Sequence, residues 1–160
     1  MPVEAVAAGS RWALLAAPAV ALLWAGLLLG VSFLATPVKF TAQSLTLPVA
    51  LDVGQATFHL LAKIEWVALA LLVITAVSAR LPLWHFAVIA LVAACLLVQT
   101  LALLPSLDAR VAAIIAGEAV PASSLHLAYV ACEMLKLILL LGFTTAVVGY
   151  WGRAGVFQWS

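Results

Sequence analysis

Apolar residues dominate four long stretches of the chain, and short polar segments separate these stretches. They cover about residues 12–35, 56–79, 83–104 and 124–150, and the second extends back as a helix toward Leu47. A helix needs roughly 20 apolar residues to cross the hydrocarbon core of a bilayer. The pattern therefore predicts an all-α polytopic membrane protein, a bundle of four transmembrane helices, with residues 1–160 forming a single integral membrane domain.

Proline and capping residues mark the predicted ends of these helices. Because proline lacks a backbone N–H, it does least harm in connections, and four prolines are expected there: Pro37, Pro82, Pro105 and Pro121. Thr46 before Leu47-Pro48 predicts an N-cap followed by a proline in the first helical turn. Between the third and fourth spans we expect a short amphipathic piece over 108–116, which Gly117 ends.

The composition agrees with a membrane protein. Hydrophobic residues make up 68% of the chain and charged residues 8%, whereas soluble domains carry about 25% charged residues. The net charge of +1 predicts no nucleic-acid partner, and the bilayer is the expected surrounding. The first apolar stretch is longer than the core of a signal peptide, about 7–15 residues, so we predict that it is a retained first span.

The charges in the loops predict the orientation. An even number of spans places both termini on one side, and that side holds Arg11, Arg80 and Arg153 against Glu4. The other side holds Lys39 and Arg110 against Asp52, Asp108 and Glu118. Tryptophans cluster at the first side, as in an aromatic belt: Trp12, Trp84, Trp151 and Trp159. The positive-inside rule then predicts a multi-pass protein of the bacterial inner (plasma) membrane with both termini in the cytoplasm.

Four charged residues fall inside the predicted spans: Lys63, Glu65, Glu133 and Lys136. Each costs about 2.5–3.5 kcal/mol at the centre of a membrane helix, so each needs a partner, a wet cavity or a route to the interface. The long stem of Lys63 can reach outward to the interface, whereas the shorter Glu65 cannot. Lys136 lies near the midplane and most needs a partner.

The fourth span carries its polar residues on one stripe. At 100° per residue, His126, Tyr129, Glu133 and Lys136 fall within an arc of about 80°. We predict that the second span packs on the fourth with Glu65 facing this stripe, so that Lys136 lies between Glu133 and Glu65. These five residues are the candidate solute- or ion-binding site. The alternative is an ion pair that only fixes how the helices assemble.

Uncharged polar residues could belong to the same site. Ser32 and Thr36 on the first span, and Gln99 and Thr100 on the third, either line the cavity or bond backbone carbonyls of their own helices. Trp24 lies deep in the first span and belongs to packing or to a site.

Several features recur about 68 positions apart. Pro37 matches Pro105 and Glu65 matches Glu133, while His59 and His126 are 67 positions apart. The recurrence is typical of two parallel helical hairpins related as a repeat. Coincidence explains three matches equally well, and the sequence leaves both readings open.

Cofactor chemistry has one candidate site. His59 and His126 are expected at matching depth on two spans, and a haem or a metal ion could bind there. Cys95 and Cys132 fall inside apolar runs, where free cysteine packs as a small hydrophobic residue. The sequence contains no H-E-x-x-H, no C-x-x-C, no G-x-S-x-G and no Gly-rich phosphate loop, which favours a protein that is not an enzyme.

The segment "LLWAGLLLGVSFLATPVKF", with its Trp-x-Gly and its Pro-x-x-Phe, resembles the first hairpin of small uncharacterised bacterial four-span proteins. These are loosely grouped with the CopD-like (copper-resistance D) membrane proteins. The resemblance covers about the first 65 residues and implies a four-helix fold. The wider group includes a copper-uptake domain and a haem-linked oxidase of porphyrin synthesis. This chain lacks their early histidine in the first span and has no His/Met cluster.

Three functions remain open at this point. The first is transport or permeation of a small solute, an ion or a proton through a periplasm-facing cavity that ends at the Glu/Lys cluster. Four helices are few for a transporter, so this reading predicts a homo-oligomer or a subunit of a membrane complex. The second is a haem- or metal-binding redox protein. The third is a non-catalytic accessory subunit of a larger membrane complex.

Overall fold

The structure, a computed structural model, describes residues 11–153, and the described chain is all-α. Its elements are α2 (Arg11–Leu28), η1 (Leu29–Ala35), α3 (Thr36–Lys39), α4 (Leu47–Ser78), α5 (Leu83–Val98), η2 (Gln99–Leu103), α6 (Leu104–Ile115) and α7 (Leu125–Arg153). Where these elements follow one another without a break they form four continuous helices, each long and apolar enough to cross a membrane. The predicted four-helix bundle is confirmed.

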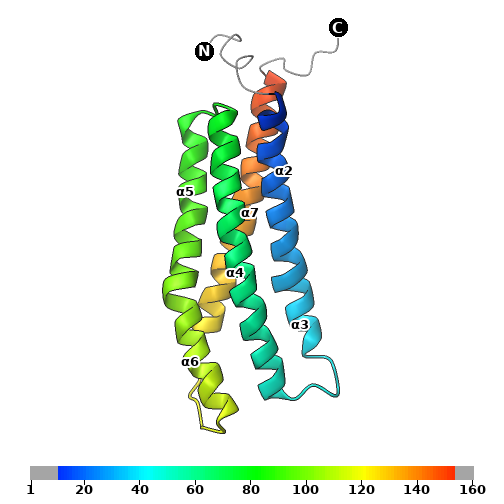
Figure 1. Ribbon diagram of the computed structural model, residues 1–160, viewed down its shortest axis with the longest axis vertical. Coiled ribbons are helices and arrows are strands. Elements are labelled where there is room, and N and C mark those ends of the chain that lie inside the picture. The colour runs from blue at the N-terminus through cyan, green and yellow to red at the C-terminus, as the bar shows by residue number, and fades with distance from the viewer. Residues whose placement is uncertain (1–10, 154–160) are drawn as a thin grey trace.

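The four helices run alternately up and down, with short connections at both ends (Figure 1). The loop between α4 and α5 lies at the same end as the start of α2 and the end of α7, which we call the terminal end (Figure 1). The connections from α3 to α4 and from α6 to α7 lie at the opposite end, which we call the far end (Figure 1). α2 packs against α4 and α7, and α5 also packs against both α4 and α7.

This packing corrects one prediction. α4 and α7 were expected to be neighbours, but each lies between α2 and α5, so the two face each other diagonally across the bundle. The stripe of polar residues gives the direction in which α7 faces, which is toward the axis of the bundle. It carries no information on which helix lies beside α7 and which lies opposite.

Pro37 and Pro105 also differ from their predicted places, because both lie inside continuous helices. The first helix runs on to Lys39 and the third to Ile115, where ends near 35 and 104 were predicted. Each proline follows a π-helical segment, η1 or η2, whose wider turn gives room to the ring that would clash in an α-helix.

The two π-helical segments end alike, and this likeness adds to the sequence repeat. Thr36 donates its backbone N–H to the carbonyl of Val31, five residues earlier, and Leu104 donates in the same way to Gln99. Pro37 and Pro105 come directly afterwards. The same backbone feature thus recurs at the spacing that relates Glu65 to Glu133.

Other predicted ends are confirmed. α4 begins at Leu47 with Thr46 in an extended conformation before it and proline in its first turn, although the Thr46 side chain makes no capping hydrogen bond. Gly117 follows α6 with a φ of 79°, in the left-handed region that favours glycine.

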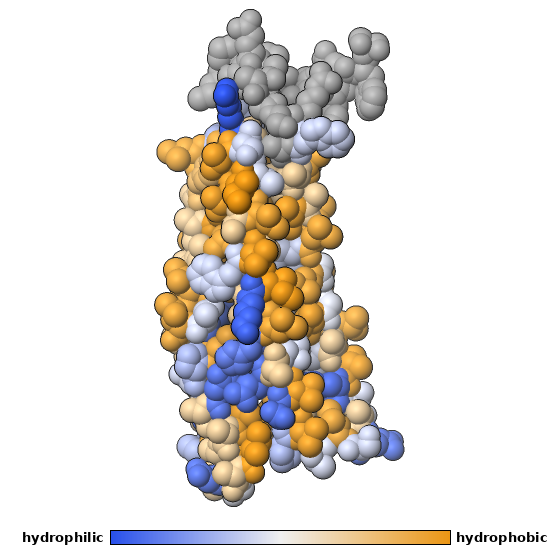
Figure 2. Space-filling model, viewed as in Figure 1, coloured by the Kyte–Doolittle hydropathy of each residue, from blue (hydrophilic) through white to orange (hydrophobic). Residues whose placement is uncertain are grey.

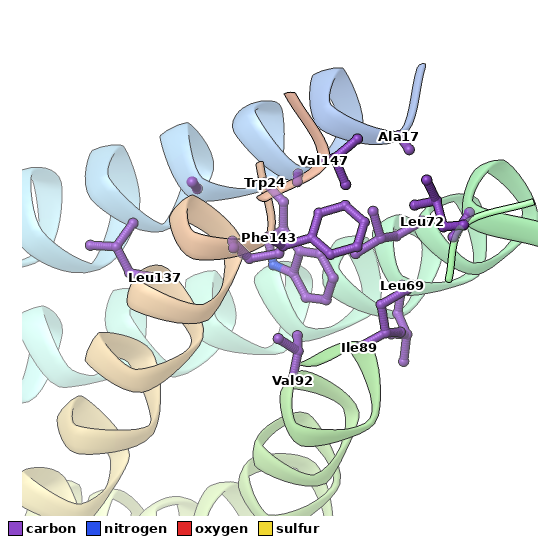
Figure 3. Close-up of a cluster of buried hydrophobic side chains, with 14 of the residues drawn as sticks. Ala17, Trp24, Leu69, Leu72, Ile89, Val92, Leu137, Phe143 and Val147 are labelled. Carbon is purple, nitrogen blue, oxygen red and sulfur yellow. The ribbon is translucent and has the colours of Figure 1, made fainter. Parts of the chain in front are cut away.

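The buried apolar side chains form two clusters. The larger one fills the half of the bundle toward the terminal end, where Trp24, Leu72, Ile89 and Phe143 interdigitate (Figure 3). A smaller one, toward the far end, consists of Ala62, Leu103, Leu104 and Tyr129. The outer surface stays largely hydrophobic, with hydrophilic colour gathered over the lower part of the face that Figure 2 shows. The polar side chains described next lie between the two clusters.

Candidate functional site

Three charged side chains meet in the interior of the bundle. Lys136 Nζ lies 2.9 Å from Glu133 Oε1 and also bonds to Glu65 Oε1. Glu65 and Lys136 are 0% exposed and Glu133 is 1% exposed. The predicted placement of Lys136 between the two carboxylates is confirmed, although Glu65 reaches it across the axis of the bundle.

Uncharged donors from the other two spans complete this arrangement. Trp24 donates from Nε1 to Glu65 Oε1 at 2.9 Å. Gln99 donates from Nε2 to Glu133 Oε1 at 2.7 Å, and Ser32 donates from Oγ to Glu133 Oε2 at 2.8 Å. All four spans therefore contribute to one hydrogen-bonded set, which we call the polar network: Trp24, Ser32, Glu65, Gln99, Glu133 and Lys136.

The structure resolves the open alternatives for the uncharged polar residues. Ser32 and Gln99 bind the carboxylate, while Thr36 and Thr100 donate to carbonyl oxygens of their own helices. Ser32 belongs to η1 and Gln99 to η2, so each π-helical segment supplies one side chain that donates a hydrogen bond to Glu133. Bulges of this kind occur frequently at functional sites.

Trp24 is the member of the polar network that the sequence indicated least. Its indole is 2% exposed and packs in the larger apolar cluster, while its N–H reaches the polar network. The sequence did contain one indication of this role. A tryptophan deep in a membrane span places an indole N–H there, and a buried tryptophan N–H usually has a hydrogen-bond acceptor.

The polar network holds two carboxyl groups and one amino group. With all three groups ionised, two carboxylates and one ammonium give a net charge of −1. Several buried polar atoms have no hydrogen-bond partner, among them Glu65 Oε2, Gln99 Oε1 and the Tyr129 hydroxyl. A buried polar atom without a partner is costly. The site therefore has both the charge and the free polar atoms to receive a proton, a cation or a polar group.

A cavity leads to this network from the far end. Two adjoining cavities, of about 100 Å³ and about 340 Å³, have Thr36, Phe40, Phe58, His126 and Tyr129 in common in their walls. The larger one extends inward to Ser32 and Glu133.

The cavity runs along the polar stripe of α7. Three of its residues line the larger cavity, namely His126, Tyr129 and Glu133, whereas Lys136 lies beyond the cavity wall. Glu133 comes eight residues after the start of α7, which is roughly 12 Å along a helix at 1.5 Å per residue. The cavity thus reaches well into the span, and the larger apolar cluster fills the bundle beyond it.

The two histidines have different surroundings. His59 Nε2 lies 2.8 Å from Asp108 Oδ2 and pairs α4 with α6 at the surface, while His126 lines the cavity. Within residues 11–153, no group of three or more His, Cys, Asp and Glu side chains could hold a metal ion. Cys95 and Cys132 are both free. A haem or metal site at His59 and His126 stays a prediction.

Comparison with known proteins adds no family to these observations. No family model matches the chain, and no curated protein and no solved structure matches it either. The resemblance to the CopD-like proteins therefore remains a prediction, and the site must be interpreted from its own geometry.

Proposed function

We propose that this protein transports or admits a small solute, an ion or a proton across the bacterial inner membrane. The cavity at the far end receives the solute, and the polar network at its inner end binds it. The observation that carries the proposal is Glu133, a buried carboxyl group that lines the cavity and is hydrogen-bonded to Lys136, Gln99 and Ser32. By the positive-inside rule the far end faces the periplasm.

Two features of the bundle support movement through this site. Within residues 11–153, the larger apolar cluster fills the bundle between the polar network and the terminal end, while the cavity lies on the far-end side of the polar network. Passage then requires a rearrangement of the helices. The π-helical segments η1 and η2 interrupt two of the spans, as such bulges frequently do at functional sites, and they carry Ser32 and Gln99.

The accessory-subunit reading explains the same ion pairs differently. Buried charge pairs can specify which helices pack together without binding any solute. On that reading the protein conducts nothing, and replacing Glu65, Glu133 and Lys136 together by neutral residues keeps its function. On the transport reading, Glu65→Gln alone abolishes the activity while the fold survives.

Flux measurements on the purified chain in liposomes test the proposal. A pH-sensitive dye inside the vesicles reports proton entry under a potassium diffusion potential, and charge movement on a solid-supported membrane reports transport of added solutes. We expect flux above that of empty vesicles, lost in Glu65→Gln and Glu133→Gln. Two matched controls should retain it: Glu118→Gln, which neutralises an exposed loop carboxylate, and Thr100→Val, which removes a hydroxyl bonded within its own helix.

The proposal fails if the wild-type chain shows neither proton entry nor charge movement beyond the Glu133→Gln variant. Four spans are few for a transporter, so we also propose that the protein acts as a homo-oligomer or as a subunit of a membrane complex. Native mass spectrometry of the detergent-extracted protein would show a single 16.7 kDa chain if this second proposal is wrong.

A further inference from the structure

We infer that the cavity binds a small organic cation, with its positive head beside Glu133 and its apolar body among the aromatic rings of the cavity wall. This inference names the substrate class of the site described above and so rests on the proposed function. Three independent observations carry it: the charge at the inner end, the size and lining of the cavity, and an unpartnered hydroxyl in its wall.

The charge at the inner end favours a cation. Glu133 Oε1 already receives hydrogen bonds from Lys136 and Gln99, whereas Oε2 receives one from Ser32. Since a carboxylate oxygen offers about two acceptor positions, Oε2 keeps one free. The polar network has a net charge of −1 when ionised, and a positive ligand head at Oε2 would neutralise it.

The size of the cavity favours an organic body over a bare ion or a proton. A volume of about 340 Å³ corresponds to roughly ten waters at about 30 Å³ each. Apolar and aromatic side chains form most of the wall, including Phe33, Phe40, Phe58 and Val130. Phe58 and Tyr129 meet edge to face, with their ring centroids 5.1 Å apart and an angle of 67° between their planes. Such rings attract cations over their faces.

The wall of the smaller cavity already contains one positively charged side chain, Lys39. Lys39 Nζ lies 5.1 Å from the centre of the Phe40 ring, at the wall of the smaller cavity. It occupies space that Gly54 leaves open, because a Cβ atom at Gly54 would lie 2.5 Å from Nζ. Asp108 lines the same smaller cavity and pairs with His59, so the smaller cavity holds a carboxylate as well as the Lys39 ammonium.

The Tyr129 hydroxyl is the third observation. Tyr129 is 3% exposed, lines both cavities, and its hydroxyl has no hydrogen-bond partner. A buried tyrosine hydroxyl usually has one. A ligand with a polar group in the cavity would supply it, next to the carboxylate that holds the positive head.

Equilibrium binding of labelled benzyltrimethylammonium to the detergent-purified chain tests the inference, with empty micelles as background. Two probes of similar shape accompany it: the neutral carbon isostere neopentylbenzene and the anion phenylmethanesulfonate. We expect the cation to bind at least about tenfold more tightly than either, because cation–π contacts and the carboxylate act on it alone. Equal binding of the three probes, or tighter binding of the anion, would overturn the inference.

Variants locate the binding in the cavity. Glu133→Gln should weaken cation binding about tenfold or more, while Glu118→Gln, the exposed loop carboxylate, leaves it unchanged. If Glu133→Gln does not fold, Phe58→Leu provides an independent test of the inference. This variant keeps an apolar side chain but removes the aromatic ring. Cation binding should therefore fall about threefold, while binding of the neutral isostere should not change. Unchanged cation binding in Phe58→Leu would contradict the inference.

This measurement separates the inference from the proposed function, because it needs neither a vesicle nor a gradient. Cation binding without any flux in liposomes would refute transport and leave the binding site. Flux of protons or other ions without cation binding would refute the organic cation and leave transport.

Discussion

Replacing Lys136 by methionine removes the positive charge that holds two buried carboxylates together. Glu65 and Glu133 both bond to Lys136 Nζ, and all three side chains are at most 1% exposed. Methionine keeps most of the length and volume of the side chain. The variant therefore isolates the charge and its hydrogen bonds from the packing of α7.

The size of the effect follows from this geometry. Two oxygens that bond to the same nitrogen lie about 5 Å apart, given hydrogen bonds of about 3 Å. Two negative charges at about 5 Å repel by about 3 kcal/mol at an effective dielectric constant of about 20. Removing one partner of a buried ion pair costs about 3–5 kcal/mol in measured cases. We expect Lys136→Met to lower the free energy of unfolding by this amount.

Thermal unfolding of the purified chain in detergent measures the change. For a chain of this length about 3–5 kcal/mol corresponds to a fall in Tm of roughly 10 °C. Adding Glu65→Gln to Lys136→Met removes the repulsion and should restore more than half of the loss, since the glutamine oxygen still accepts from Trp24. The matched control is Lys63→Met, an exposed lysine on α4, which should shift Tm by less than about 2 °C. A Lys136→Met variant that melts as the wild type does would refute the reasoning.

Three further predictions concern other parts of the bundle. Trp24→Phe removes the indole donor to the α4 carboxylate and should cost about 1–3 kcal/mol in thermal unfolding, and a neutral result would mean that another group satisfies the carboxylate. Gly54→Ala should change the free energy of unfolding by less than about 1 kcal/mol, because the atom that its Cβ meets is the end of the flexible Lys39 side chain; a much larger loss would show that Lys39 cannot move. A membrane-impermeant maleimide should label Ser123→Cys from the periplasmic side, and Arg80→Cys only after the membrane is permeabilised; the reverse result would invert the predicted orientation.

Some of the candidate site could be predicted from sequence because its parts lie on one helix. Tyr129, Glu133 and Lys136 share a face through helical geometry alone, and three charges in lipid require one another. The hydroxyl and amide partners were ambiguous for a physical reason. Serine and glutamine in a membrane helix can bond either to their own backbone or across to a neighbour, and local sequence does not separate these choices.

The predicted helix ends also show that local sequence alone can mislead. Proline is a strong signal for the end of a helix, and it failed at Pro37 and Pro105 because a π-helical segment before each ring removes the clash. An average of hydropathy over a window of residues cannot detect a π-helical turn, whose hydrogen bonds span one more residue than those of an α-helix. The consequence matters for the site, since these segments carry Ser32 and Gln99.

The sequence by itself determined that this is a four-span membrane bundle with an acid–base stripe on its last helix. Each span must satisfy its own backbone in lipid, so its existence is a local property of about 20 residues. The tertiary structure alone decided that α4 and α7 stand diagonally, that Glu65 reaches Lys136 across the axis, and that a cavity ends at Glu133. Those facts depend on packing between residues that lie 34 to 101 positions apart in the chain, such as Gln99 with Glu133 and Ser32 with Glu133.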